Sequence, residues 1–238
     1  MPNSSERGPM LARIRAGLAR NGAMFAAEAA SAPHNAPPYV HPPQTDLAAQ
    51  FASELAKLQG HPHRAADAEE AIKIIQQILH AKGASDVLAW DLTQIGLTGL
   101  AAMLTNEGVT IQTIGPPHDA TGRAAHYAAL EPVLVCISGV DVAIAESATL
   151  VVRGGPGRPR LASLLAPTYI AIVPERLLVR GLGEALAKLR MTHGDRLLDA
   201  ASGLTLITGP SRTADIEMTL TLGVHGPREV HVVIVGGG

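Results

Sequence analysis

The sequence holds almost no cysteine: Cys136 is the only one in 238 residues. A single thiol forms no intramolecular disulfide, and iron–sulfur clusters are usually held by several cysteine thiolates. One chain therefore supplies neither such a cluster nor a cysteine-type zinc site. Because Cys136 lies within an apolar run, residues 132–137, we predict that it is a small buried side chain.

Aromatic residues are also scarce, at 3% of the sequence, and the formal net charge is −2. Stacking of nucleic-acid bases needs aromatic side chains, and capture of nucleic acid or of an anionic membrane needs a positive field. Both kinds of partner are therefore disfavoured. No apolar run reaches the roughly 18 to 20 residues of a membrane-spanning helix, and the arginine-containing N-terminus has no apolar block like that of a signal peptide. We expect a soluble, cytoplasmic protein without a membrane span.

Hydrophobic residues make up 47% of the sequence. From about residue 61, short apolar segments alternate with amphipathic segments, which predicts an α/β fold with a mostly parallel sheet and helices on both faces. Residues 1–27 have the spacing of an amphipathic helix, and residues 31–46 are rich in proline. We therefore predict an N-terminal helical segment with a proline-rich linker, residues 1–60, and one α/β domain, residues 61–238.

The N-terminal helix is expected to pack through Leu11, Ile14 and Leu18 on its own domain or on a second subunit. In the linker, His34 and His41 are expected to be solvated, and we predict no metal site. Within the domain we predict helices and strands from apolar periodicity, capping residues and glycines. The helices are residues 47–58, 67–82, 98–106, 120–130 and 183–193, and the strands are a short segment after Gly60 and residues 86–90, 109–114, 133–138, 169–174, 203–208 and 230–235.

The segment from Ser138 to Val152 predicts two apolar strands joined by a polar turn at Glu146 and Ser147. Ligand sites in open α/β sheets lie at the ends of strands, so Glu146 is a candidate general base or hydrogen-bond acceptor. The alternative is an exposed turn glutamate without a function. A glycine-rich loop follows, residues 154–157, and we expect the arginines after it, Arg158 and Arg160, to be solvated unless they close over an anionic ligand.

A polar loop between two apolar strands follows residue 208 and carries a second candidate site. A glycine permits close backbone approach, an arginine suits a carboxylate or phosphate, and hydroxyls complete an anion cradle. The alternative is that these residues cap a turn, with the arginine paired to a neighbouring acid. The ligand-binding candidates in this loop are Gly209, Ser211, Arg212, Thr213, Asp215 and Glu217.

The residues after this loop alternate in polarity from Met218 to Leu222, which favours a strand over a competing helix. Residues 223–227 are predicted to turn the chain into a hairpin whose second arm is residues 230–235. The first strand of the region, residues 203–208, is expected to be buried.

The run ITGPSRTADIE (residues 207–217), followed by LGVHGP and HVVIV, resembles the C-terminal signature of the lactate-utilisation protein C family, whose shared module is the LUD domain. Residues 138–152 resemble the same family, and Asp141, Ala145, Glu146 and Thr149 match its pattern. The sequence departs from that pattern at residues 136–138 and at Ser147-Ala148, where the family usually has Thr-Gly.

The resemblance implies a fold related to that of ribose-phosphate isomerases, CoA transferases and methenyltetrahydrofolate synthetases. It also implies a place in a three-component system that oxidises L-lactate to pyruvate, in which another member carries the iron–sulfur cysteines. We therefore expect an accessory subunit without a cofactor of its own, with a small anionic ligand site that includes His225. We also expect an iron–sulfur partner subunit and association into homo-oligomers. The alternatives are a freestanding isomerase or transferase acting on a sugar phosphate or acyl-CoA, and a regulatory ligand sensor.

Overall fold

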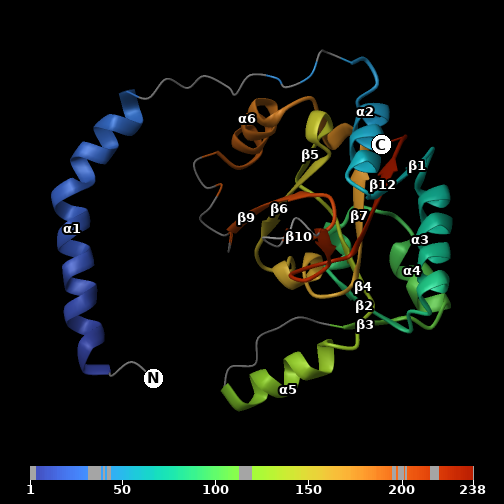
Figure 1. Ribbon diagram of the computed structural model, residues 1–238, viewed down its shortest axis with the longest axis horizontal. Helices are drawn as coiled ribbons and strands as arrows, with labels where there is room; N and C mark the ends of the chain where they lie inside the picture. The colour runs from blue at the N-terminus through green and yellow to red at the C-terminus, as the bar shows by residue number, and fades with distance from the viewer. Residues whose placement is uncertain are drawn as a thin grey trace. The chain divides into compact units, whose positions relative to one another are not determined.

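The computed structural model describes residues 4–31, 39, 41, 44–112, 120–194, 197, 201, 203–214 and 220–237 (Figure 1). By its internal contacts the chain divides into two units, residues 1–36 and 37–238. The first contains helix α1 (Ser4–Ser31), which confirms the predicted helix and extends it. Its Leu11, Ile14 and Leu18 are exposed. None of the described helices is long and apolar enough to cross a membrane.

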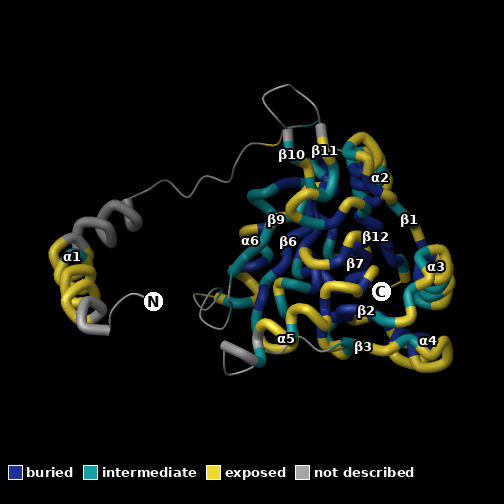
Figure 2. Tube along the Cα trace, turned by 60° about the horizontal axis from the view of Figure 1, so that its bottom comes forward, coloured by how far each residue is buried: buried dark blue, intermediate teal, exposed yellow. Residues whose placement is uncertain are grey.

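The second unit is built on a six-stranded sheet in which every neighbouring pair of strands is parallel. Its neighbouring strands β12 (Glu229–Val235) and β7 (Thr168–Pro174) are almost entirely buried, as Figure 2 shows, because both faces of the sheet are covered. Such strands read as continuous apolar runs, which is why HVVIV was recognisable as one. In spatial order the strands are β1 (His61–Ala65), β12 (Glu229–Val235), β7 (Thr168–Pro174), β4 (Val135–Ser138), β2 (Asp86–Ala89) and β3 (Thr110–Gln112).

Helices lie on both faces of this sheet, as predicted. On β1, Arg64 forms an ion pair with Asp46, the residue that caps the start of α2. On the opposite face, Glu229 of β12 forms an ion pair with Lys82 at the end of α3. The helices of the second unit are α2 (Leu47–Lys57), α3 (Ala68–Lys82), α4 (Leu100–Asn106), α5 (Ala120–Leu130) and α6 (Leu182–His193).

Helix α3 begins and ends where its sequence predicts. The Asp67 carboxylate accepts a hydrogen bond from the Glu70 amide at 2.9 Å, and Gly83 ends the helix with a φ of 61°. A left-handed residue at this position is usually glycine because a side chain is strained there.

Replacing Asp67 by alanine should lower the free energy of unfolding by about 1 kcal/mol, because it leaves an amide at the helix start without its acceptor. Urea denaturation of the full chain measures this change. Asp67→Asn keeps a side-chain oxygen and is the matched control. Equal stability of the alanine variant and the wild type would contradict the capping role.

Helix α2 is part of the core of the second unit. Its Phe51 and Leu55 are fully buried in the same apolar cluster as the sheet. The predicted domain boundary at residue 61 assigns α2 to the N-terminal segment. That boundary stays a prediction, and the packing of α2 bears directly on it.

A second, smaller sheet has the strand order β8 (Leu178–Val179), β5 (Val142–Ile144), β6 (Thr149–Gly154) and β9 (Gly203–Thr208). Strands β5 and β6 are antiparallel and confirm the predicted pair of strands around Glu146. The prediction that β9 is buried is wrong: Leu206 is half exposed, because β9 is the edge of this sheet. In α6, which packs on β5, Leu189 is buried as expected but Leu186 is exposed.

The predicted hairpin between residues 218–222 and 230–235 is also wrong. Strand β11 (Leu220–Leu222) pairs with β10 (Arg212–Ala214) in a separate two-stranded sheet. Strand β12 cannot take β11 as a neighbour because β1 and β7 already occupy both of its edges.

Candidate functional site

Glu146 lies in a single 3₁₀ turn, η2 (Ala145–Ser147), between β5 and β6. The residue is 6% exposed, so it is not the exposed turn glutamate of the alternative interpretation. Its amide donates a hydrogen bond to the carbonyl oxygen of Arg180 at 3.1 Å. This bond joins the turn to the segment between β8 and α6.

Ala148 follows this turn with a positive φ of 49°. The related family usually has glycine here, and glycine is the residue that adopts such a backbone without strain. The turn therefore keeps its left-handed geometry although the glycine is missing.

The start of α6 forms the wall opposite Glu146. A side chain at Gly181, the residue before the helix, would come within 2.7 Å of Glu146 Oε1, so only glycine lets the carboxylate lie this close. In the first turn of α6, Glu184 accepts a hydrogen bond from the Arg180 amide at 2.8 Å. Helix N-termini favour negative charge because their amides are not used within the helix. Glu146 thus lies where a carboxylate or another anion is stabilised.

Two residues of the proline-rich linker complete this site. The Tyr39 hydroxyl donates to Glu184 Oε1 at 2.5 Å, and the Arg180 guanidinium lies 3.6 Å from the centre of the Tyr39 ring. The hydrogen bond to Glu184 raises the pKa of the Tyr39 hydroxyl. Arg180 also donates to the backbone oxygen of His41 at 2.9 Å. The sequence predicts a solvated linker at His41, whereas the backbone of His41 bonds to Arg180. The one tyrosine of the linker was the sequence feature that could have indicated this contact.

Arg180 has one further hydrogen-bond donor that a ligand could use. Its Nε is buried and has no hydrogen-bond partner among the described residues. A buried donor without a partner is costly, so a ligand acceptor at this atom would be stabilising. Arg180 was not among the residues predicted from the sequence.

The two motifs predicted from the sequence meet through a row of hydroxyl groups. Thr149 Oγ1 lies 2.8 Å from Ser147 Oγ and 2.8 Å from Thr208 Oγ1. Thr149 and Thr208 are also paired in the β6–β9 ladder. Because Thr149 follows the turn that carries Glu146 and Thr208 directly precedes Gly209, the C-terminal loop starts beside this turn.

The loop itself is held by structural contacts. Gly209 has a positive φ of 74° and packs against Leu58, where a side chain would come within 3.0 Å of Leu58 Cβ. The Ser211 amide donates to the Pro227 oxygen at 2.9 Å, and the Ser211 oxygen accepts from the Gly223 amide at 2.9 Å.

The other candidates of the loop have separate surroundings. Arg212 donates to the Leu58 oxygen at the end of α2, so it has a structural partner other than the acids expected. Thr213 lies opposite Thr221 in the β10–β11 ladder, and His225 is exposed. Asp215 and Glu217 lie outside the described residues. A ligand role for these residues stays a prediction.

Asp141, another residue that matches the family pattern, has a structural contact. It accepts hydrogen bonds from Arg158 Nη1 and from the Arg153 amide, both at 2.7 Å. The Arg158 guanidinium also lies over the Trp90 ring, 4.7 Å from its centre, and bonds to Gln94. The prediction that Arg158 is a solvated loop residue is therefore wrong.

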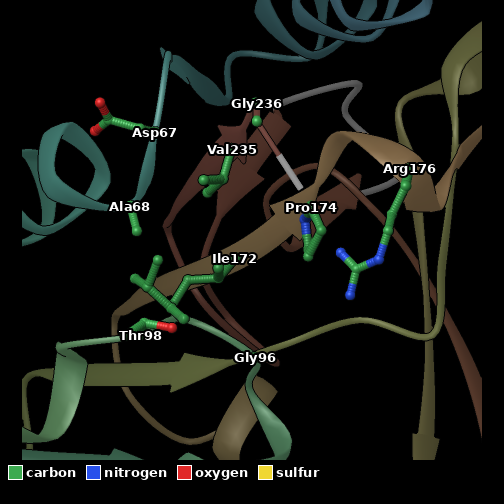
Figure 3. Close-up of a pocket in the computed structure, with 11 residues that line it drawn as sticks. Asp67, Ala68, Gly96, Thr98, Ile172, Pro174, Arg176, Val235 and Gly236 are labelled. Atoms are coloured by element: carbon green, nitrogen blue, oxygen red, sulfur yellow. The ribbon is translucent and has the colours of Figure 1, made fainter.

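A small pocket lies at the carboxyl ends of β7 and β12, where ligands of parallel sheets commonly bind (Figure 3). Its volume is about 190 Å³, and its polar lining comes from Asp67, Thr98 and Arg176. Figure 3 shows Arg176 on the side of the pocket opposite Asp67. A neighbouring hollow of about 460 Å³ shares Gly236 with it. Neither was predicted, although the charged residues directly after β7 were a usable signal.

Metal ligands gather elsewhere. Among the described residues, His61, Glu229 and His231 are the group that could hold a metal ion. Burial lowers the pKa of His231 to about 4, so this imidazole is neutral near pH 7. Neutral imidazole is the form that binds metals.

The comparisons with known proteins cover most of the chain. The model of the LUD domain family matches residues 48–235. Lactate utilization protein C of Shouchella clausii (strain KSM-K16) is 32% identical over 68% of this chain and 67% of its own length. The protein of the same name from Halalkalibacterium halodurans is 34% identical over 68% of this chain and 67% of its own length.

One solved structure supports the fold. The crystal structure of a DUF162 family protein from Deinococcus radiodurans matches with a TM-score of 0.56 and 21% identity, over 82% of this chain and all of that one. The family match spans both sequence blocks of the candidate site and the six-stranded sheet. The chain belongs to the LUD domain family.

Proposed function

We propose that the protein serves L-lactate utilisation as an accessory subunit without a cluster of its own, and that the Glu146 site binds a small carboxylate ligand. The relatives named lactate utilization protein C support the first part. The observation that supports the second is the burial of Glu146 against the start of α6, next to Arg180.

The chemistry of this site suits a 2-hydroxy acid. Arg180 supplies positive charge and a buried donor for a carboxylate, and the amides at the start of α6 add to the same field. The Glu146 carboxylate is an acceptor for a ligand hydroxyl. The Ser147, Thr149 and Thr208 hydroxyls lie along the neighbouring strands and can complete the polar lining.

The proposed division of labour follows from the redox chemistry. Oxidation of lactate to pyruvate removes a pair of electrons and a pair of protons, so it needs an electron acceptor. The single cysteine of this chain cannot ligate an iron–sulfur cluster, and we therefore place the clusters on a partner subunit. The role left to this chain is to bind ligand and to position it for the partner.

A buried carboxylate also suits a general base, which keeps a second function in view. The protein would then be a freestanding isomerase or transferase acting on a sugar phosphate or acyl-CoA. Such an enzyme would act without an iron–sulfur partner, and its loss would not selectively affect growth on lactate.

Growth on L-lactate tests the proposal. A host strain that lacks this chain should fail to grow with L-lactate as sole carbon source and should grow normally on glucose. The wild-type chain should restore growth, and Glu146→Gln, which keeps the shape but not the charge, should not. Purified Glu146→Gln should also bind L-lactate at least tenfold more weakly by calorimetry, as expected for loss of a charge-assisted hydrogen bond from the lactate hydroxyl.

Glu131→Gln is the matched control because Glu131 is an exposed glutamate directly after α5, outside the elements that form the site. It should behave as the wild type in both measurements. Normal growth of the strain without this chain would overturn the role in lactate utilisation. Full restoration of growth by Glu146→Gln, at equal protein level, would overturn the site.

A further inference from the structure

Four side chains of the kinds that bind metals share one face of the sheet edge. His61 of β1 lies opposite His231 of β12 in the parallel ladder. Residues two apart on a strand point to the same face, so His63 and Glu229 join them. Helix α3 covers this face, and its Lys82 contacts Glu229. The cluster therefore depends on a pairing between the beginning and the end of the second unit.

The distances fit the requirements of a small divalent ion. The ligand atoms of His61, Glu229 and His231 all lie within 4.8 Å of one another. His231 Nε2 and Glu229 Oε2 are 3.4 Å apart. Zinc bonds of about 2.0 to 2.2 Å in a tetrahedron require ligand atoms roughly 3.3 to 3.5 Å apart. One edge of the tetrahedron is thus already formed.

His61 can supply the third ligand by a side-chain rotation alone. Its ring stacks on that of His231, with centres 4.6 Å apart. The lone pairs of the imidazole nitrogens lie in the ring planes, and these planes are only 21° from parallel, so His61 must turn to bring a lone pair onto the same ion. The residue is exposed, which leaves room for this rotation.

His63 has the position of an outer partner that orients a ligand. Its Nε2 lies 3.1 Å from His231 Nδ1. When Nε2 of His231 binds a metal, the remaining proton lies on Nδ1 and is donated to His63. Metal-bound histidines commonly make such a bond with their second nitrogen. Lys82 Nζ donates a hydrogen bond to Glu229 Oε2 at 2.5 Å and so holds this carboxylate beside the two histidines.

We propose that His61, Glu229 and His231 bind one divalent transition-metal ion of the zinc class, with His63 as the partner that orients His231. Three protein ligands leave a fourth tetrahedral position for water or a ligand. This metal site is separate from the ligand site proposed at Glu146. Glu146 belongs to η2, which packs on α2, and α2 lies on the opposite face of the six-stranded sheet.

Metal titration of the full chain tests this site. Tag-free protein is stripped with a chelator and titrated with Zn²⁺ by calorimetry and with Co²⁺ by visible absorption. We expect saturation at about one equivalent, with the intense visible bands of tetrahedral Co²⁺. His61→Ala should weaken binding at least tenfold, and His63→Ala should weaken it roughly ten- to a hundredfold. Because His61 is exposed, its variant should keep the wild-type circular dichroism spectrum.

The sequence has ten histidines, so a matched control is needed against scattered surface binding. His80 is another exposed histidine that lies beside a carboxylate, that of Glu107, and it is outside the cluster. His80→Ala should leave the stoichiometry and the affinity unchanged. Absence of saturable binding would overturn the proposal, and so would a His61→Ala variant that binds as tightly as the wild type. Either result leaves the growth test of the Glu146 site unaffected.

Discussion

Phe51→Ala is expected to lower the free energy of unfolding by about 3 to 5 kcal/mol. The Phe51 ring is fully buried in the main apolar cluster. Truncation to alanine loses the transfer free energy of the ring and leaves a cavity that close-packed neighbours fill only in part. Urea denaturation of the full chain, followed by circular dichroism, measures the change. Ser53→Ala, at an exposed position of the same helix, should stay within about 0.5 kcal/mol of the wild type.

This measurement also decides where the domain begins. If residues 1–60 were independent of the α/β domain, as the sequence predicts, a cavity in α2 would leave the stability of residues 61–238 unchanged. The packing of α2 on β1 and on η2 leads us to expect the opposite. A change near zero would show that α2 is dispensable and would support the boundary at residue 61. A large change would include α2 in the domain and tie it to the turn that carries Glu146.

Local physics explains what the sequence predicted well. Asp67 and Gly83 set the ends of α3 through a capping carboxylate and a left-handed glycine, and both act on residues nearby in the chain. The apolar runs of β7 and β12 were recognisable because strands buried on both faces have no polar side. The β5–β6 pair was recognisable because its two strands follow each other directly. These features needed no knowledge of distant residues.

The wrong hairpin and the largest omissions involve distant pairings. The sequence predicts that β11 pairs with β12, but β11 pairs with β10. Both edges of β12 are occupied by β1 and β7, and a local sequence pattern does not show which strand edges are occupied. The histidine cluster exists only because residue 61 pairs with residue 231. Tyr39 reaches Glu184 across 145 positions of sequence. Contacts of this kind follow from the topology, which a single sequence restricts only by class.

The environment of Cys136 determines how reactive its thiol is. The residue is fully buried in β4, and its Sγ donates a weak hydrogen bond to the Leu161 oxygen at 3.6 Å. Burial raises the pKa of the thiol to about 11. Near pH 8 this lowers the thiolate fraction by about a hundredfold compared with a thiol at its ordinary pKa, and only the thiolate reacts or binds metals.

We therefore expect a thiol reagent such as an aromatic disulfide to react with the native protein at least a hundredfold more slowly than with the urea-unfolded protein at pH 8. The rate on the native protein should rise as the pH increases toward 11, because the thiolate fraction increases. Cys136→Ala gives the blank, since it removes the only thiol. Equal rates for native and unfolded protein would contradict the buried thiol. A protected Cys136 could not join thiolates from other copies to hold a cluster. Anaerobically purified protein should therefore contain no stoichiometric iron–sulfur cluster.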